Sequence, residues 1–291
     1  MPEGDTIYRS ARALGRALTG KTVTRFESAY ALIARADDED PLAGQTITKV
    51  EARGKWLLIH FSGRPTEEGK SAKPAPILVT HMLMSGSWHI YRPGERWFAP
   101  RSDVRIQLET ADFVALAIRV PVAKMHTAAT LLRDRAIPPA ASDVLRESFN
   151  PNDAVARLLS YADEELGHVL LRQKVLAGVG NVYKSEICFL LGLSPFRKVG
   201  TLTPRQAEDI VATTQRLMAA NVLEDSGDGI ITYQGKKRRT TRSADPEASK
   251  WVYGRKGQPC RRCNTPIERC LQGPQARSTY WCPHCQPLPN P

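Results

Sequence analysis

The stretch Cys260-Arg261-Arg262-Cys263, followed after eighteen residues by Cys282-Pro283-His284-Cys285, decides the fold of the C-terminal part of this chain. Each Cys-x2-Cys pair can present two thiolates from one tight turn, and four thiolates complete a tetrahedral site. The length between the pairs suits a β-hairpin. Because protein sulfur fills all four positions, we expect one structural Zn²⁺ per chain, with iron in a rubredoxin-like site as the alternative.

The composition points to a polyanionic partner. The chain has 291 residues, with 41 basic against 30 acidic side chains and a net charge of +11. A basic surface favours nucleic acid first and acidic membranes second. No apolar run approaches the roughly 18 residues that span a bilayer, and Glu3, Asp5 and Arg9 interrupt any secretory signal at the N-terminus. The paired cysteines favour metal binding in a reducing compartment, so we expect a soluble intracellular protein.

The N-terminal part is predicted to be one helix followed by strands. Ile7, Ala11, Leu14 and Leu18 recur at helical spacing, and Gly20 ends the pattern. The stretches that follow are rich in Val, Ile, Thr and aromatic residues, and they are separated by turns. They are Lys21–Ser28, Gln45–Phe61, Pro76–Tyr91, Asp103–Glu109 and Asp112–Arg119. This pattern predicts a β-sandwich or a flattened barrel.

The pattern becomes helical after the prolines near residue 138. Helices are predicted at Asp153–Tyr161, Glu164–Leu170, Gly180–Leu191 and Pro204–Ala220. We therefore expect a multidomain α+β chain: a β-sandwich domain over residues 1–135, a helical domain over 136–225, a basic mobile loop over 226–250, and a metal-binding finger with a tail over 251–291. The basic residues 233–242 could contact DNA specifically, or could add only nonspecific affinity.

The opening Met1-Pro2-Glu3 carries potential chemistry. If Met1 is removed, Pro2 becomes a secondary amine whose pKa lies near 8, so part of it is neutral and nucleophilic in the cell. Such an amine can attack an electrophilic sugar carbon and form an iminium ion. The neighbouring Glu3 carboxylate could move protons during that reaction. Taken alone, a Met-Pro start is common and means little.

Together with the cysteines and several internal motifs, this opening resembles the formamidopyrimidine-DNA glycosylase/endonuclease VIII family. Arg53-Gly54-Lys55 resembles the family's strand that bears a basic residue, and His81-Met82-Leu83-Met84-Ser85-Gly86 resembles its base-gap loop. Residues 177–186, AGVGNVYKSE, closely match the turn and second helix of its helix-two-turn-helix (H2TH) unit. Residues 252–260, VYGRKGQPC, lead into the finger as in the family.

The resemblance implies a role for each matching residue. Pro2 would be the nucleophile at C1′ of the damaged nucleotide, Glu3 its proton-transfer partner, and Lys55 a phosphate contact that assists catalysis. Asn181 and Arg277 would hold phosphates. Once the damaged base has left the stack, Met84, with Leu83 as a second candidate, would fill the gap; both could equally be core residues. The implied active site lies in a cleft between domains, and the implied partner is double-stranded DNA with oxidised bases or abasic sites, bound by a monomer in the bacterial cytoplasm.

Departures from the family pattern bear on the substrate. Asp5 stands where the formamidopyrimidine enzyme typically has Pro, and Thr6 where the family often has Glu. No Arg-x-Phe void-filling pair is evident near Ile118–Val122. The opening is more similar to endonuclease VIII, especially its actinobacterial members, and this favours oxidised pyrimidines.

The sequence therefore predicts a bifunctional DNA glycosylase/AP lyase of base excision repair that cleaves by β,δ-elimination. Two alternatives stay open. One is an 8-oxoguanine/formamidopyrimidine glycosylase of the same family. The other is a noncatalytic protein that binds damaged DNA, which would have no need of the free Pro2 amine.

Overall fold

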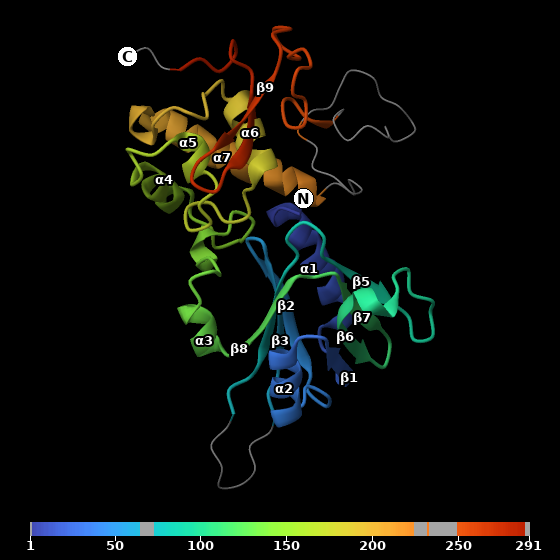
Figure 1. The fold of residues 1–291 in the computed structure, drawn as a ribbon. Coiled ribbons are helices and arrows are strands. Elements are labelled where there is room, and N and C mark those ends of the chain that lie inside the picture. Colours follow the sequence, from blue (N-terminus) through green and yellow to red (C-terminus); the bar gives the residue numbers. More distant parts are fainter. Residues whose placement is uncertain (1, 65–72, 224–231, 233–248, 289–291) are drawn as a thin grey trace. The chain divides into compact units, whose positions relative to one another are not determined.

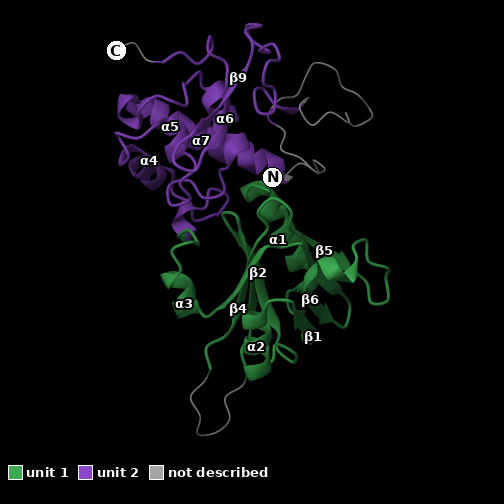
Figure 2. Ribbon diagram, viewed as in Figure 1, with its two compact units in different colours: residues 1–139 green, residues 140–291 purple. Residues whose placement is uncertain are grey.

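The structure, a computed structural model, describes residues 2–64, 73–223, 232 and 249–288 (Figure 1). The chain divides into two compact units, residues 1–139 and residues 140–291, which are described separately (Figure 2). The basic residues 233–242, for which a DNA contact was considered, lie outside the described residues. Within the described part of the chain, no helix has the length and apolar character needed to cross a membrane.

The first unit is built on two four-stranded antiparallel sheets, as the alternating strand patterns predict. One sheet has the order β1 (Val23–Ser28), β6 (Val104–Thr110), β7 (Val114–Ile118) and β5 (Ser87–Tyr91). The other has the order β2 (Ile47–Arg53), β3 (Trp56–Phe61), β4 (Ile77–His81) and β8 (Val122–His126). The β-sandwich prediction is confirmed.

The core of this unit forms because alternate residues of the strands point to one side. Leu57 and Ile59 of β3 and Ala115 and Ala117 of β7 belong to a single buried cluster. Helix α1 (Gly4–Leu18) adds its apolar face to that cluster, and Gly20, at φ +79°, follows its end. Thus the predicted N-terminal helix covers the sandwich core.

Three elements of this unit were not predicted. They are α2 (Ala31–Glu39), strand β8 and α3 (Ala128–Arg133). Helix α2 buries only Ile33, so its sequence carries little helical periodicity. A short 3-10 turn, η1 (Arg101–Asp103), precedes β6.

The second unit begins with four helices that agree with the predicted stretches: α4 (Pro151–Leu159), α5 (Leu166–Val169), α6 (Asn181–Leu190) and α7 (Pro204–Leu223). Short 3-10 turns lie at η2 (Ala140–Ser142) and η3 (Val199–Thr201). The Asn150 side chain caps α4 by accepting the N–H of Asn152 at 2.9 Å, and Pro151 takes the first position. Nearly every residue of α6 is buried, which makes it the central helix.

The predicted hairpin of the finger is formed by β9 (Glu268–Gln272) and β10 (Arg277–Trp281). Phe189 of α6 packs in one buried cluster with Val252, Ile267 and two of the cysteines. The finger therefore shares its small core with the helical region of the same unit. Figure 1 shows the finger's hairpin, labelled at β9, beside α6.

Candidate functional site

The N-terminal segment places two carboxyl groups in the protein interior. Helix α1 begins after Glu3, whose backbone C=O accepts the N–H of Ile7 at 3.1 Å. The Glu3 side chain is fully buried, and Pro2 is half-buried beside it. A carboxylate enclosed directly after Pro2 is the arrangement expected of a proton-transfer partner for an N-terminal amine.

Asp5, in the first turn of α1, is the second buried carboxyl group. Its contact with a positive charge is Arg9 in the next turn, whose Nη2 lies 3.8 Å from Oδ2. Burial, and next the charge of Glu3, raise the pKa of Asp5 from 3.8 to about 6. Sequence reasoning treated Asp5 as a departure from the family's opening; its position between Glu3 and Arg9 could have marked it as a buried charged group.

Lys55 lies in the tight turn that joins β2 to β3. Arg53 and Trp56 are cross-strand partners, so Gly54 and Lys55 form a two-residue loop, and Gly54 adopts φ +58°. Trp56 holds this turn in place, because its Nε1–H donates to the carbonyl of Ala136 at 3.1 Å. Lys55 itself is partly exposed.

The predicted base-gap loop follows β4 and starts at His81. The ring of His81 packs edge-on against Trp56 at 4.8 Å between centroids, and its Nδ1 accepts the N–H of Leu83 at 3.1 Å. Burial, and then the charge of Lys55, lower the pKa of His81 to about 4, so the ring is neutral and can accept this bond. The contacts of His81 with Trp56 and Leu83 therefore hold the start of the loop in place.

The tip of this loop is turned outward. Leu83 takes φ +46°, and Leu83 and Met84 are 46% and 70% exposed. Of the two readings left open by the sequence, the core role is wrong for both residues. Met84 is the more accessible side chain for insertion into a base stack.

In the second unit, the glycine-rich turn before α6 is held by one side chain. Gln173 accepts the N–H of Gly178 at 3.0 Å and donates to the carbonyl of Val179 at 3.0 Å. Gly178 adopts φ +101°, and Gly180 precedes Asn181, the first residue of α6. The N-terminus of α6 therefore follows directly from a turn that the Gln173 side chain holds.

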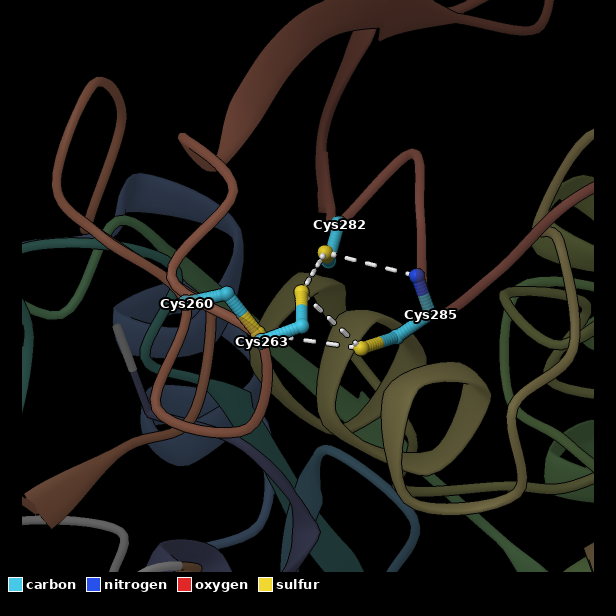
Figure 3. Close-up of side chains that lie close together, drawn as sticks. All are labelled: Cys260, Cys263, Cys282 and Cys285. Atoms are coloured by element: carbon cyan, nitrogen blue, oxygen red, sulfur yellow. Dashed lines mark hydrogen bonds between the residues drawn. The ribbon is translucent and has the colours of Figure 1, made fainter.

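The four cysteines converge in the finger, as the spacing predicts (Figure 3). Their sulfur atoms all lie within 4.8 Å of one another, with Cys260 to Cys285 at 3.8 Å and Cys263 to Cys282 at 3.4 Å. A tetrahedral zinc with bonds of about 2.3 Å requires sulfur separations of about 3.8 Å. The set is therefore positioned for zinc binding.

The structure also places Cys188, His284 and Arg277. Cys188 is buried, and burial raises the pKa of its thiol, so it is a core residue. His284 is exposed, and the metal cluster contains cysteines alone. Arg277 is exposed at the start of β10, where Gln275 accepts its guanidinium N–H groups at 3.2 Å.

Glu186 of α6 anchors the approach to the finger, a role that sequence reasoning missed. Its carboxylate is fully buried and accepts the backbone N–H groups of Trp251 at 2.8 Å, Val252 at 3.0 Å and Tyr253 at 2.8 Å. Thr232 donates its hydroxyl to the same group. The segment before Cys260 is thus fixed to the helix that starts at Asn181.

Two family domains match this chain. Residues 1–119 match the formamidopyrimidine-DNA glycosylase N-terminal domain, and residues 140–233 match the formamidopyrimidine-DNA glycosylase H2TH domain. A probable endonuclease 8 2 of Streptomyces coelicolor is 36% identical, with 100% of this chain and 96% of that protein aligned. A DNA-(apurinic or apyrimidinic site) lyase Nei2 of Mycolicibacterium smegmatis is 35% identical over 98% of this chain and 99% of its own length.

Solved structures agree in fold. The formamidopyrimidine-DNA glycosylase of Lactococcus lactis, bound noncovalently to DNA that contains an AP site, superposes with a TM-score of 0.74 at 19% identity, covering 98% of this chain and 99% of that one. Both matched domains together span most of the sequence, and the relatives align along nearly its whole length. The chain therefore belongs to the formamidopyrimidine-DNA glycosylase family.

Proposed function

We propose that this chain, by family a DNA glycosylase and AP lyase, removes oxidised pyrimidines from duplex DNA with Pro2 as nucleophile. The observation that carries the proposal is the fully buried Glu3 carboxyl directly after Pro2. A protein that only binds damaged DNA has no need of a buried carboxyl group there, because burial costs free energy without adding a DNA contact.

The reaction follows from the amine. After Met1 is removed, the neutral fraction of Pro2 attacks C1′ and the bond from C1′ to the base breaks, its electron pair leaving with the base. The Pro2 nitrogen then loses its proton and the C1′–O4′ bond of the sugar ring breaks, with O4′ taking up a proton, which gives an iminium ion between Pro2 and C1′. This ion acidifies the C2′ proton, and successive β- and δ-elimination cut the strand on both sides of the lesion. Glu3 transfers protons during these steps, and Lys55 contacts the neighbouring phosphate. Removal of Met1 is required, since an amide nitrogen has no nucleophilic lone pair.

The DNA contacts are proposed to come from both units. Met84, exposed at its loop tip, fills the space that the extruded base leaves. Asn181 at the start of α6 and Arg277 at the finger tip hold phosphates. The net charge of +11 supports binding to the DNA backbone in general.

The metal is proposed to be zinc. Four thiolates match its preference, and the sulfur separations fit a tetrahedral ion. Cys260, Cys263, Cys282 and Cys285 would hold it, and it would stabilise the finger that carries Arg277. Elemental analysis of the purified protein separates zinc from iron: one zinc per chain is expected, and one iron would make the rubredoxin-like alternative correct.

A preference for pyrimidines is supported by two observations. The relatives from Streptomyces and from enterobacteria carry the name endonuclease 8. The opening Gly4-Asp5-Thr6 also departs from the Pro typical of the formamidopyrimidine enzyme.

Borohydride trapping tests the proposal. The Met1-processed protein is incubated with duplexes that contain one thymine glycol, one 8-oxoguanine or one abasic site. A covalent band with the native chain and none with Pro2→Ala is expected, and thymine glycol should give more product than 8-oxoguanine. The reverse order would select the oxidised-purine glycosylase. No band on any duplex, despite tight binding and confirmed Met1 removal, would leave the noncatalytic binding protein as the better reading.

A further inference from the structure

A fully buried lysine lies inside the second unit. Lys184 of α6 is 0% exposed, and its Nζ donates a hydrogen bond of 2.6 Å to Oγ1 of Thr279 on β10. Burying an ammonium group is costly unless hydrogen bonds and an opposite charge compensate it. The groups that compensate the buried Lys184 ammonium therefore have to lie nearby.

The hydrogen bonds continue from Thr279 to a carboxylate. Thr279 donates its hydroxyl to Oε1 of Gln272 at 2.7 Å, and Gln272 Nε2 donates to Oε2 of Glu165 at 2.8 Å. Each donor points in the same direction, from the lysine cation towards the glutamate anion. Aligned hydrogen bonds of this kind polarise and strengthen one another. We call Lys184, Thr279, Gln272 and Glu165 the relay.

The surroundings are shaped to admit the relay. The second N–H of the Gln272 amide donates to the carbonyl of Pro195 at 2.8 Å, so both amide donors are used. A Cβ atom at residue 167 would overlap Oε1 of Gln272, so a residue larger than Gly167 would displace the Gln272 amide from these hydrogen bonds. Four segments of the unit thus meet at Gln272.

Three residues of the relay adjoin the two proposed phosphate contacts, one in α6 and two in the hairpin. Lys184 follows Asn181 by three residues, so both lie on one face of α6. Thr279 follows Arg277 by two residues, and Gln272 is the cross-strand partner of Arg277. Residues two apart on a strand, and directly opposed residues, share a face of the hairpin.

We propose that Lys184 is a positioning residue that, through the relay, holds Asn181 and Arg277 at a fixed separation so that they bind their phosphates as one unit. The inference rests on the proposed DNA contacts of these two residues. Well-packed apolar side chains often replace a buried ionic network without loss of stability, so stability alone does not account for the relay. A fixed register between α6 and the hairpin accounts for the relay.

A double-mutant cycle tests this. The dissociation constant of a duplex with a tetrahydrofuran abasic analogue is measured for Asn181→Ala, Arg277→Ala and both together, in the native chain and in Lys184→Met. Each loss is the factor by which a substitution raises the dissociation constant. In the native chain, the factor for the double mutant should be smaller than the product of the two single factors by about five-fold or more, because one contact contributes less to binding once the other has been removed. With Lys184→Met the losses should simply multiply.

Further variants keep the outcomes distinct. Thr279→Val cuts the relay while keeping the lysine, and should also make the losses multiply. Lys198→Met removes an exposed lysine of the same unit and should leave the native coupling unchanged. Metal content and the midpoint of thermal unfolding identify any variant that fails to fold.

Two results would overturn the inference. The same coupling in the native, Lys184→Met and Thr279→Val chains would show that the relay does not position the contacts. If neither Asn181→Ala nor Arg277→Ala weakens binding in the native chain, the proposed phosphate contacts are themselves wrong, and the relay has nothing to position. Only this second result would also contradict the DNA contacts in the proposed function.

Discussion

Replacing Glu186 with Gln weakens the attachment of the finger to α6, while the size and shape of the side chain at residue 186 stay nearly the same. One carboxylate oxygen accepts the N–H groups of Val252 and Tyr253, and the other accepts the N–H of Trp251 and the hydroxyl of Thr232. A glutamine can present its oxygen to only one of these pairs. Its NH₂ group then faces the Trp251 N–H, and a buried donor that loses its acceptor costs about 1–3 kcal/mol.

The loss of charge adds to this cost. Two hydrogen bonds to a carboxylate become bonds to a neutral carbonyl, and each weakens by roughly 1 kcal/mol. The neutral side chain is easier to bury, which offsets part of the loss. We expect Glu186→Gln to lower the free energy of unfolding of the second unit by about 3 kcal/mol in total.

Urea unfolding followed by the fluorescence of the five tryptophans, with release of the finger's metal recorded by a chromogenic chelator, measures this effect. Both transitions should move to lower urea together. Glu208→Gln, on the exposed surface of α7, is the matched control and should shift stability by less than about 0.5 kcal/mol. A Glu186→Gln chain as stable as the control would refute the reasoning that this carboxylate anchors residues 251–253.

Three further outcomes are expected. Because the folded pKa of Asp5 is raised from 3.8 to about 6, the native state binds its proton more tightly than the unfolded state. In a chain that retains Met1, stability should therefore fall by about 3 kcal/mol as pH rises from about 3 to about 7. Thermal melts should show this fall, and Asp5→Asn should abolish it. Met84→Ala should leave the melting temperature unchanged, because the side chain is 70% exposed, yet slow single-turnover excision at least several-fold; an unchanged rate would remove Met84 from the DNA contacts. Chelation of the metal should weaken binding to undamaged DNA as well as to lesions, since it releases the hairpin of Arg277; unaltered affinity after confirmed metal loss would contradict a structural role.

The parts of the fold that sequence predicted are those with strong local signals. The metal cluster follows from four cysteines, and the sandwich follows from strands whose alternate residues are buried. Strand β8 lacks such a signal: all its residues are half-buried, and its partner β4 lies far back in the sequence. The helix α2 has one buried residue and no side-chain cap, so neither periodicity nor capping marks it.

The candidate site divides in the same way. Pro2, Glu3 and Lys55 were named because their motifs are local, and the structure supplies the burial of Glu3 and the turn at Lys55. Lys184 and Glu186 were missed, because a charged residue in a helix ordinarily reads as surface. Their partners lie 95 and 65–67 residues along the chain, a separation that no local pattern encodes.

The shared core of helix and finger has a consequence for biosynthesis. Phe189 packs against Val252, Ile267 and the metal cysteines, so α6 cannot complete its packing until the last cysteines have left the ribosome. Contacts between distant segments form late, because the intervening chain must first be closed into a loop. A chain truncated before Cys282 would therefore lack part of the packing that stabilises α6, the helix that begins at Asn181. Incomplete chains from ribosomes that stall late in translation should then bind damaged DNA poorly, so they would not compete with the complete enzyme for it.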